Sequence, residues 1–487
     1  MRRCFLLLID GLRPDVAEAE LVAGRLPSLA RLVASGGAGR AITSFPSTTS
    51  VSYLPFLTGC TPGTCNVPSI RWLDRTRYDG RWWRSRDAVR SYCGYQAGML
   101  DADIDPSVRT IFELVPESVG IFTMIARGLT PERNPASVER QFWGAVAHYA
   151  LWHQPSDTAV ANHLLQTVEG PARFVFAQFP AVDGYTHQSS PQAQRVVQSL
   201  HEVDAVVGRL QARLAARREL DDTLILVVSD HGASVVHQHL DLAEWFRRQG
   251  VRTMSHPVVW ERHPKAAVMV AGNGSAMVYA HPDTPRESRW PLARLRRPDT
   301  FGTGSDLIER LVREPAVAFV AAEAAEGRVT IADTGGEANI SRENGRIRYE
   351  PDSGDPLHVG ETWEGTDREW LAHSWSSAMP DAAYQLLDQF RASRTGDLLV
   401  IGREGYDFRE RFEIPEHRSG HGSLIRAHMH TPLWSNRRLG QLPLRTIDLF
   451  PTMLDWLSVP VPPSIDGELV WKAVSGERFA PSRLRSG

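Results

Sequence analysis

The sequence predicts an α/β fold: a three-layer core around a central, mostly parallel sheet, with a smaller α+β cap inserted into it. Two observations predict this class. Short apolar runs end at acidic residues, and amphipathic helical patterns lie between those runs. Strands and helices that alternate in this way form a parallel sheet with right-handed crossovers. The length of 487 residues allows two or three structural units.

Three apolar runs have the composition of strands that are buried on both faces. They are Cys4–Ile9, Phe174–Phe179 and Thr223–Ser229, each too short for a typical helix. An acidic residue follows each run, namely Asp10, Asp183 and Asp230. We therefore expect the tips of three strands to present three carboxylates.

Helical patterns connect these strands. From about Pro191 to Arg218, apolar residues recur at alternating spacings of four and three, which gives one apolar face that packs on a sheet. A shorter helix is expected to begin at Pro27 and to end at Gly36, because proline favours the first helical turn and glycine the end.

The pattern changes between about Val235 and Thr395, where glycine and proline become frequent. Short β-like runs occur at Ala266–Val270, Ala276–Ala280 and Ala316–Val320, and Glu343-Asn344-Gly345-Arg346 predicts a hairpin turn. We assign residues 1–235 and 396–487 to the core and residues 236–395 to the inserted cap. Asp397–Ile401 is expected to be a further strand of the core sheet.

Charge and composition limit the partners and the location. With 54 Lys+Arg against 57 Asp+Glu, the formal charge of -3 creates no field that attracts a nucleic acid polymer or an anionic membrane. The apolar run near the N-terminus stops at Asp10, whereas a secretory segment needs about 7–15 apolar residues and a membrane span about 20. We expect a cytoplasmic protein with four reduced cysteines; the sequence leaves its oligomeric state open.

Several polar residues have the type and spacing of metal ligands. Asp10 alone is a weak signal, because an acid after a strand often caps a turn. Asp183 and His187 are four residues apart, a spacing that an Asp–His pair on the surface would also show. The motif Asp230-His231-Gly232 follows the most hydrophobic predicted strand. Further along, His417, His421, His428 and His430 form a cluster that a solvated loop would also explain. Together these groups supply the mixed oxygen and nitrogen donors that suit two ions of zinc, with manganese as the second choice.

A nucleophile is available in the segment Thr43–Ser52, which holds several hydroxyl groups before an apolar stretch expected to be helical. For most of these hydroxyls a role as helix cap is the simpler interpretation. One of them, if held by a cation, would ionise near neutral pH and attack phosphorus.

Taken in their order along the chain, these motifs resemble those of the alkaline phosphatase superfamily. Within it, they resemble the type I phosphodiesterase/nucleotide pyrophosphatase branch. The resemblance rests on Asp10, Leu57-Thr58-Gly59-x-x-Pro62, Asp183-x-x-x-His187, Asp230-His231-Gly232 and His421-Gly422-Ser423. It covers roughly residues 1–235 and 396–460 and implies an alkaline-phosphatase-like core.

The resemblance also implies roles for individual residues. Asp183, His187 and His421 would hold one zinc ion, and Asp10, Asp230 and His231 the other. Such enzymes carry a threonine nucleophile nine residues before the Thr of the Thr-Gly pair, which gives Thr49 as catalytic residue and metal ligand, with Thr48 as the alternative. Ser52 stands where these enzymes place an asparagine that holds a phosphate oxygen, so this contact differs. A sulfatase is rejected, because Cys60-Thr61-Pro62-Gly63-Thr64 lacks the required arginine.

The resemblance implies a two-metal hydrolase that acts on a phosphodiester or a nucleotide-pyrophosphate-like substrate through a phospho-threonine intermediate. The partner would be a small phosphate ester. The alternatives are a phosphomonoesterase, a phosphonate hydrolase, a phosphomutase-type transferase and a non-catalytic metal-binding relative.

Overall fold

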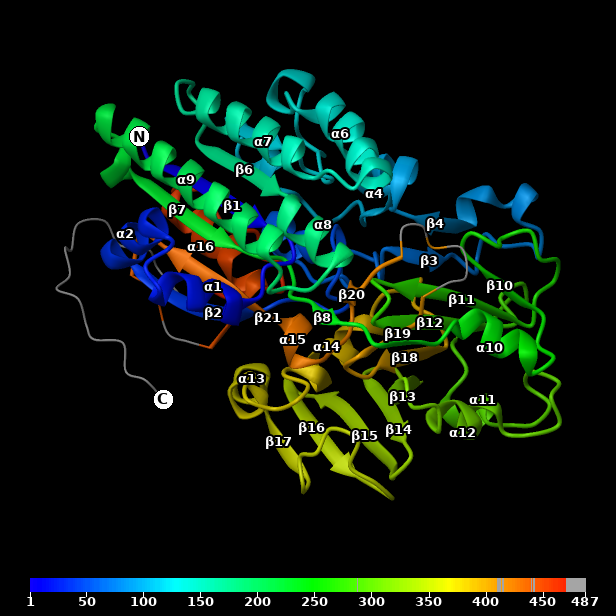
Figure 1. Cartoon of the computed structure of the whole chain (residues 1–487). Helices are drawn as coiled ribbons and strands as arrows, with labels where there is room; N and C mark the ends of the chain where they lie inside the picture. The colour runs from blue at the N-terminus through cyan, green and yellow to red at the C-terminus, as the bar shows by residue number, and fades with distance from the viewer. Residues whose placement is uncertain (287, 410–412, 414–415, 439, 441–442, 470–487) are drawn as a thin grey trace.

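The computed structural model describes residues 1–469 apart from 287, 410–412, 414–415, 439 and 441–442. Its strands form a seven-stranded sheet, a nine-stranded sheet and three two-stranded pairs (Figure 1). The expected α/β class is confirmed. The last residues of the second predicted core segment, 470–487, lie outside the described residues.

The seven-stranded sheet is mixed and mostly parallel. Its order is β22-β2-β21-β7-β1-β6-β5, and only β21 (His430–Ser435) runs antiparallel to its neighbours β7 and β2. The other strands are β1 (Arg3–Ile9), β2 (Gly37–Ile42), β5 (Ser118–Ile121), β6 (Phe174–Phe179), β7 (Thr223–Val228) and β22 (Leu444–Arg445). All three predicted apolar runs are strands of this sheet.

The register of the central strands aligns their carboxyl ends. Ile9 of β1 lies beside Phe179 of β6, and Leu8 lies beside Val228 of β7. Because the three strands are parallel and end at the same level, the residues that follow them emerge at one edge of the sheet.

Helices cover both faces of this sheet, which gives the predicted three layers. Phe5, Leu7 and Ile9 of β1 pack in one core with α2 (Pro27–Ser35), α7 (Gln154–Thr167) and α9 (Gln194–Ala216). The alternate residues Cys4, Leu6 and Leu8 point to the opposite core, which includes α3 (Leu54–Thr58) and α16 (Leu449–Trp456). Both helices expected from the sequence exist, with ends within a few residues of those predicted.

The nine-stranded sheet has the order β10-β11-β12-β18-β13-β14-β15-β16-β17. Its strands are β10 (Thr253–Ser255), β11 (Ala266–Ala271), β12 (Ser275–Ala280), β13 (Val317–Ala325), β14 (Arg328–Asp333), β15 (Gly336–Glu343), β16 (Arg346–Pro351), β17 (Trp363–Thr366) and β18 (Leu398–Gly402). The predicted hairpin turn joins β15 to β16, with positive φ at Asn344 and Gly345.

The prediction that Asp397–Ile401 is a strand of the core sheet is wrong. The run Asp397–Ile401 forms β18, which pairs antiparallel with β12 and β13 rather than with any strand of the seven-stranded sheet. A short apolar run that is buried on both faces fits either sheet, so its sequence carries no information about its partner.

The two sheets share one hydrophobic core. Leu6 of β1, Met269 of β11 and Phe319 of β13 belong to the same cluster of buried side chains. Helices α13 (Asp367–Ser374) and α14 (Ala382–Gln389) add to it, whereas α10 (Leu242–Arg248), α11 (Leu292–Leu295) and α12 (Leu307–Val312) cover the other face of the nine-stranded sheet. The boundaries 1–235, 236–395 and 396–487 remain a prediction.

The remaining strands and α-helices lie outside the two large sheets and the helices already described. They are β3 (Arg71–Leu73), β4 (Val89–Ser91), β8 (Ser234–Val235), β9 (Gln238–His239), β19 (Tyr406–Asp407), β20 (Ser419–Gly420), α1 (Pro14–Val22), α4 (Leu100–Asp103), α5 (Ile111–Leu114), α6 (Ser137–Ala150), α8 (Ala181–Gln188) and α15 (Arg426–Met429). Among the described helices, none has the length and apolarity of a membrane span. All four cysteines have free thiols.

Candidate metal centre

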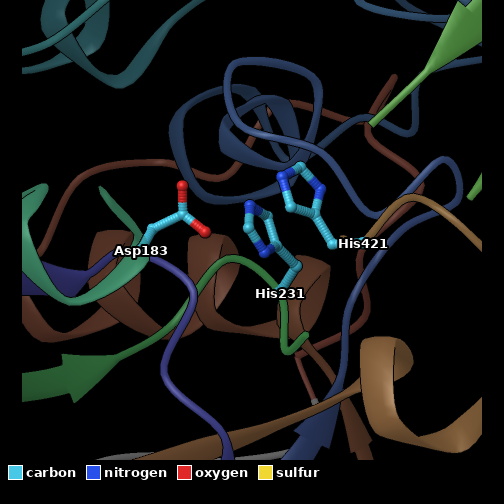
Figure 2. A group of neighbouring side chains, drawn as sticks. All are labelled: Asp183, His231 and His421. Atoms are coloured by element: carbon cyan, nitrogen blue, oxygen red, sulfur yellow. The ribbon is translucent and has the colours of Figure 1, made fainter. Parts of the chain in front are cut away.

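The polar residues predicted from the sequence meet at the carboxyl edge of the seven-stranded sheet. Asp10 directly follows β1, and Asp230 and His231 follow β7. Asp183 and His187 lie one helical turn apart on α8, which begins two residues after β6. His421 follows β20, and Figure 2 shows its ring beside that of His231, which lies between His421 and Asp183 in this view.

Asp10, Asp230 and His231 form one compact buried group, in which one ligand atom from each lies within 4.8 Å of the others. Nε2 of His231 is 3.4 Å from Oδ1 of Asp10 and 3.4 Å from Oδ2 of Asp230. The hydroxyl oxygen of Thr49 joins this group, at 3.3 Å from Asp10 Oδ1 and 3.2 Å from His231 Nε2. These are the four residues expected at one of the two ions.

Asp183, His231 and His421 form a second buried group of the same size. The rings of His231 and His421 stack with their centroids 3.8 Å apart. His187 lies beside this group, with Nε2 at 3.2 Å from Asp183 Oδ2 and its ring centroid 5.1 Å from that of His421. The structure therefore brings all seven predicted residues together, and His231 belongs to both groups.

The histidines are oriented by the backbone. Nδ1 of His187 lies 2.9 Å from the carbonyl oxygen of Ser419, Nδ1 of His231 3.1 Å from that of Gly232, and Nδ1 of His421 2.9 Å from that of Ser47. Since a carbonyl oxygen only accepts, each Nδ1 donates, and in the neutral ring Nε2 then carries the lone pair. This arrangement fixes the tautomer that binds a cation through Nε2.

Two carboxylate oxygens show that the site fits cations. Asp183 Oδ1 and Asp230 Oδ2 are buried and have no hydrogen-bond partner among the described residues. A buried carboxylate oxygen is normally paired or bound to a metal. Carboxylate and imidazole donors in this number suit zinc or manganese.

The pKa values reflect the crowding of acids at this edge. Burial, reinforced by the charge of Asp183, raises the pKa of Asp230 to about 8. Burial together with Asp230 and Asp183 also raises the pKa of Asp10 well above its usual value. Burial opposes ionisation of Asp183 as well, but the ion pair with His187 holds its pKa below the usual value. Positive charge placed between these groups would stabilise all three carboxylates.

Thr48 and Thr49 differ in what their hydroxyl groups contact. Thr49 contacts Asp10 and His231, whereas Thr48 Oγ1 is buried and finds no hydrogen-bond partner in the described part of the chain; the Thr48 methyl group faces the turn at Gly272. Ser52, the residue that departs from the family pattern, is also buried, and its hydroxyl has no hydrogen-bond partner among the residues that the structure describes.

Two further residues contact Asp10 and were missed from the sequence. Tyr53 donates its hydroxyl to Asp10 Oδ2 at 3.1 Å, and Gln178 Nε2 donates to the same oxygen at 2.7 Å. These bonds turn Oδ1 toward Thr49 and His231. A signal for Gln178 existed: it is the one polar residue in the apolar run Phe174–Phe179.

The nine-stranded sheet also reaches this site. The turn between β11 and β12 carries Gly272, whose carbonyl oxygen accepts from the N–H of His421 at 3.1 Å. A Cβ at Gly272 would lie 2.6 Å from His421 Nδ1 and 2.7 Å from the methyl group of Thr48. Only a glycine fits here, because φ is also positive, at 52°.

The family model of type I phosphodiesterase / nucleotide pyrophosphatase matches residues 4–424. The chain belongs to this family. Members of the family are metal-dependent hydrolases of phosphoric esters, and this chain supplies two groups of side chains that could bind metal. Its membership confirms the resemblance to the type I phosphodiesterase/nucleotide pyrophosphatase branch of the alkaline phosphatase superfamily. A search of curated proteins gave no significant match.

Solved structures of this superfamily share the fold. Phosphonoacetate hydrolase from Sinorhizobium meliloti 1021, in complex with phosphonoacetate, is 13% identical over 94% of this chain and 95% of its own, with a TM-score of 0.56. Human ectonucleotide pyrophosphatase / phosphodiesterase 5 is 12% identical over 96% and 98% of the two chains, with a TM-score of 0.55. The murine protein, in an inactive form bound to AMP, is 11% identical over the same shares, with a TM-score of 0.56. These similarities confirm the alkaline-phosphatase-like α/β core.

Proposed function

We propose that the protein is a two-metal phosphoric ester hydrolase that acts on a phosphodiester or a nucleotide-pyrophosphate-like substrate through a phospho-threonine intermediate. The observation that carries this proposal is the position of Thr49. Its hydroxyl oxygen lies within 3.3 Å of both Asp10 and His231, inside a buried group that shares His231 with a second such group.

Two divalent cations fit the seven side chains. Asp10, Thr49, Asp230 and His231 would hold one, and Asp183, His187 and His421 the other; zinc fits this donor set best and manganese is the alternative. When bound, such a pair supplies a lowered pKa at the nucleophile and positive charge opposite the phosphoryl oxygens.

The residues of this chain would divide the reaction into two displacements. In the first, Thr49 gives up its proton toward Asp10 Oδ1, 3.3 Å away; its oxygen bonds to phosphorus, the bond from phosphorus to the leaving oxygen breaks, and the leaving oxygen takes up that proton. In the second, a water oxygen bonds to phosphorus, the bond to Thr49 breaks and one proton of the water passes to the threonine oxygen. Tyr53 and Gln178 keep Asp10 oriented through both steps.

The substrate class rests on the family and on the ligands of the neighbours. The description of the family names phosphodiesters and nucleotide pyrophosphates. The solved neighbours bind phosphonoacetate and AMP, both small phosphorus-containing anions. A phosphonate hydrolase is therefore the second candidate, and a small phosphate ester fits the formal charge of -3 better than a nucleic acid polymer does.

The deciding experiment compares bis(4-nitrophenyl) phosphate, 4-nitrophenyl phosphate and phosphonoacetate with added zinc or manganese. We expect the diester to be hydrolysed with the highest kcat/KM. Preferential release of phosphate from the monoester or from phosphonoacetate would move the assignment to a phosphatase or to a phosphonate hydrolase. Transfer of the phosphoryl group without its release to water would indicate a phosphomutase-type transferase, and inactivity on all three a non-catalytic relative.

A cytoplasmic location is part of the proposal. The apolar run near the N-terminus forms β1, a central strand of the buried sheet, and the four cysteines are free thiols. Localisation of a tagged protein in fractionated cells tests this point.

A further inference from the structure

His417 belongs to the histidine cluster that the sequence predicts, but the proposed ligand set leaves it out. Its ring stacks on that of His187, with the centroids 4.0 Å apart and the ring planes at 27°. The centroid of His187 lies 5.1 Å from that of His421, which in turn stacks on His231 at 3.8 Å. The four imidazoles therefore form one continuous row. His417 stands at its outer end, because its side chain is 24% exposed whereas that of His231 is fully buried.

The segment that carries His417 contacts His187 at three points. The ring of His417 covers one face of the His187 ring. The carbonyl oxygen of Ser419 accepts from Nδ1 of His187 at 2.9 Å, and the N–H of Arg418 donates to the backbone carbonyl oxygen of His187 at 2.7 Å. This last contact pairs a carbonyl group in the final turn of α8, where the helix itself offers no donor.

The stacked ring restrains a motion that the hydrogen bonds allow. A single hydrogen bond at Nδ1 fixes one edge of the His187 ring, but the imidazole can still tilt about this bond. Such a tilt moves Nε2, the atom that would bind a cation together with Asp183, whose Oδ2 lies 3.2 Å away. Contact across the ring face opposes the tilt. Groups that orient metal-binding histidines in this way contribute to metal affinity.

His417 is itself held by the nine-stranded sheet. Its Nδ1 lies 3.5 Å from Oε1 of Glu413, and both carboxylate oxygens of Glu413 accept from Nδ2 of Asn273, at 2.9 and 3.0 Å. Asn273 is buried and follows Gly272 in the turn between β11 and β12. The same turn holds the N–H of His421 through the carbonyl oxygen of Gly272. One turn of this sheet therefore reaches two neighbouring predicted ligands, one directly and one through Glu413 and His417.

We propose that His417 is a positioning residue of the metal centre, whose ring holds His187 at the angle at which Nε2 shares a cation with Asp183. Asn273 and Glu413 act on His187 through His417. The inference rests on the proposed two-metal function, and it adds the residues through which the nine-stranded sheet controls the second ion.

Zinc titration of the metal-free full chain against a chromophoric chelator tests the proposal, because it yields a Kd for each of two equivalents without turnover. His417→Ala should raise the Kd of one equivalent about 10- to 100-fold. This equivalent should be the one that His187→Ala loses. The other should bind as in wild type, because His417 and His231 stand at opposite ends of the row of rings.

Two further variants separate stacking from other roles. His417→Phe keeps a planar ring without a nitrogen, so it should bind both equivalents nearly as wild type does. A loss as large as that of His417→Ala would show that a nitrogen of His417 matters rather than its ring face, and would overturn the proposal. Glu413→Ala should weaken the same equivalent, and it should have no further effect in the His417→Ala background. Additive losses would also overturn the proposal.

His373→Ala is the matched control. His373 stacks on Trp363 outside the metal centre, with the centroids 4.9 Å apart, and its loss should leave both Kd values unchanged. Wild type that binds fewer than two equivalents would overturn the two-metal function and this inference with it. Two equivalents in wild type, with both Kd values unchanged or equally raised in His417→Ala, would overturn the positioning role alone.

Discussion

The hydroxyl oxygen of Thr49 lies 3.3 Å from Oδ1 of Asp10, although 39 positions separate the two residues along the chain. One follows the central strand β1 and the other precedes the short helical segment Val51–Thr58. This contact places a weak nucleophile against a buried carboxylate and His231, where a cation would activate it.

Replacing Thr49 by alanine should abolish turnover and leave metal binding largely intact. Loss of the attacking oxygen is expected to lower kcat for bis(4-nitrophenyl) phosphate by at least about 10⁴-fold, while Asp10, Asp230 and His231 still hold the ion. Steady-state kinetics and zinc analysis check both parts. Thr48→Ala, which removes a hydroxyl that has no partner within the described residues, serves as the control; if it were the inactive variant and Thr49→Ala the active one, the nucleophile would be Thr48.

Tyr53→Phe should weaken the metal centre without removing a predicted ligand. The change deletes the O–H donor to Asp10 Oδ2 and is expected to lower kcat/KM or zinc affinity about 10- to 100-fold, as losses of hydrogen bonds to metal ligands do. Tyr92→Phe is a matched control, because Tyr92 donates to Asp103, another buried aspartate outside the site. Equal effects of the two substitutions would show that the tyrosine acts on general stability alone.

Gly272→Ala should disturb His421 from the nine-stranded sheet. The new Cβ would lie 2.6 Å from His421 Nδ1, so the ring or the turn has to move, and zinc bound per chain is expected to fall toward one equivalent. Gly302→Ala introduces a similar backbone strain, with φ at 74°, but meets no atom within 4 Å. Full zinc content in Gly272→Ala would mean that the turn adapts and does not position His421.

His428→Gln should make stability less sensitive to acid. Burial, with His231 and Arg13 nearby, lowers the pKa of His428 from 6.5 to about 3, so the folded state binds fewer protons than the unfolded state between these values. The buried neutral ring therefore costs no stability above pH 6.5. Below this pH it lowers the free energy of unfolding by about 1.4 kcal/mol for each pH unit. Chemical denaturation of both metal-free proteins at pH 7 and pH 5 measures this; parallel losses would contradict the assignment.

The sequence predicts the carboxylates at the carboxyl edge of the seven-stranded sheet because the ends of parallel strands follow a simple rule. Short apolar runs buried on both faces are recognisable, and the residues after them must emerge together, which is how Asp10, Asp183 and Asp230 could be grouped. Histidines at a spacing of four from an acid, or next to one, then identified His187 and His231.

What the sequence could not predict depends on contacts between distant segments. The partner of β18 follows from packing of the nine-stranded sheet, and nothing in Leu398–Gly402 specifies it. The contact of Gly272 with His421 brings together turns that are far apart in sequence. Tyr53 contacts Asp10 through geometry that no local spacing encodes, and the position of Gln178 in an apolar run marks it as unusual without revealing that Asp10 is its partner.

A zinc titration of the metal-free protein, with hydrolysis of bis(4-nitrophenyl) phosphate followed at each step, tests the central claim most directly. Two groups of ligands that share His231 predict two equivalents of zinc at saturation and full activity only when both are bound. Full activity with one equivalent or fewer, or hydrolysis that persists unchanged in the metal-free protein, would contradict the two-metal account.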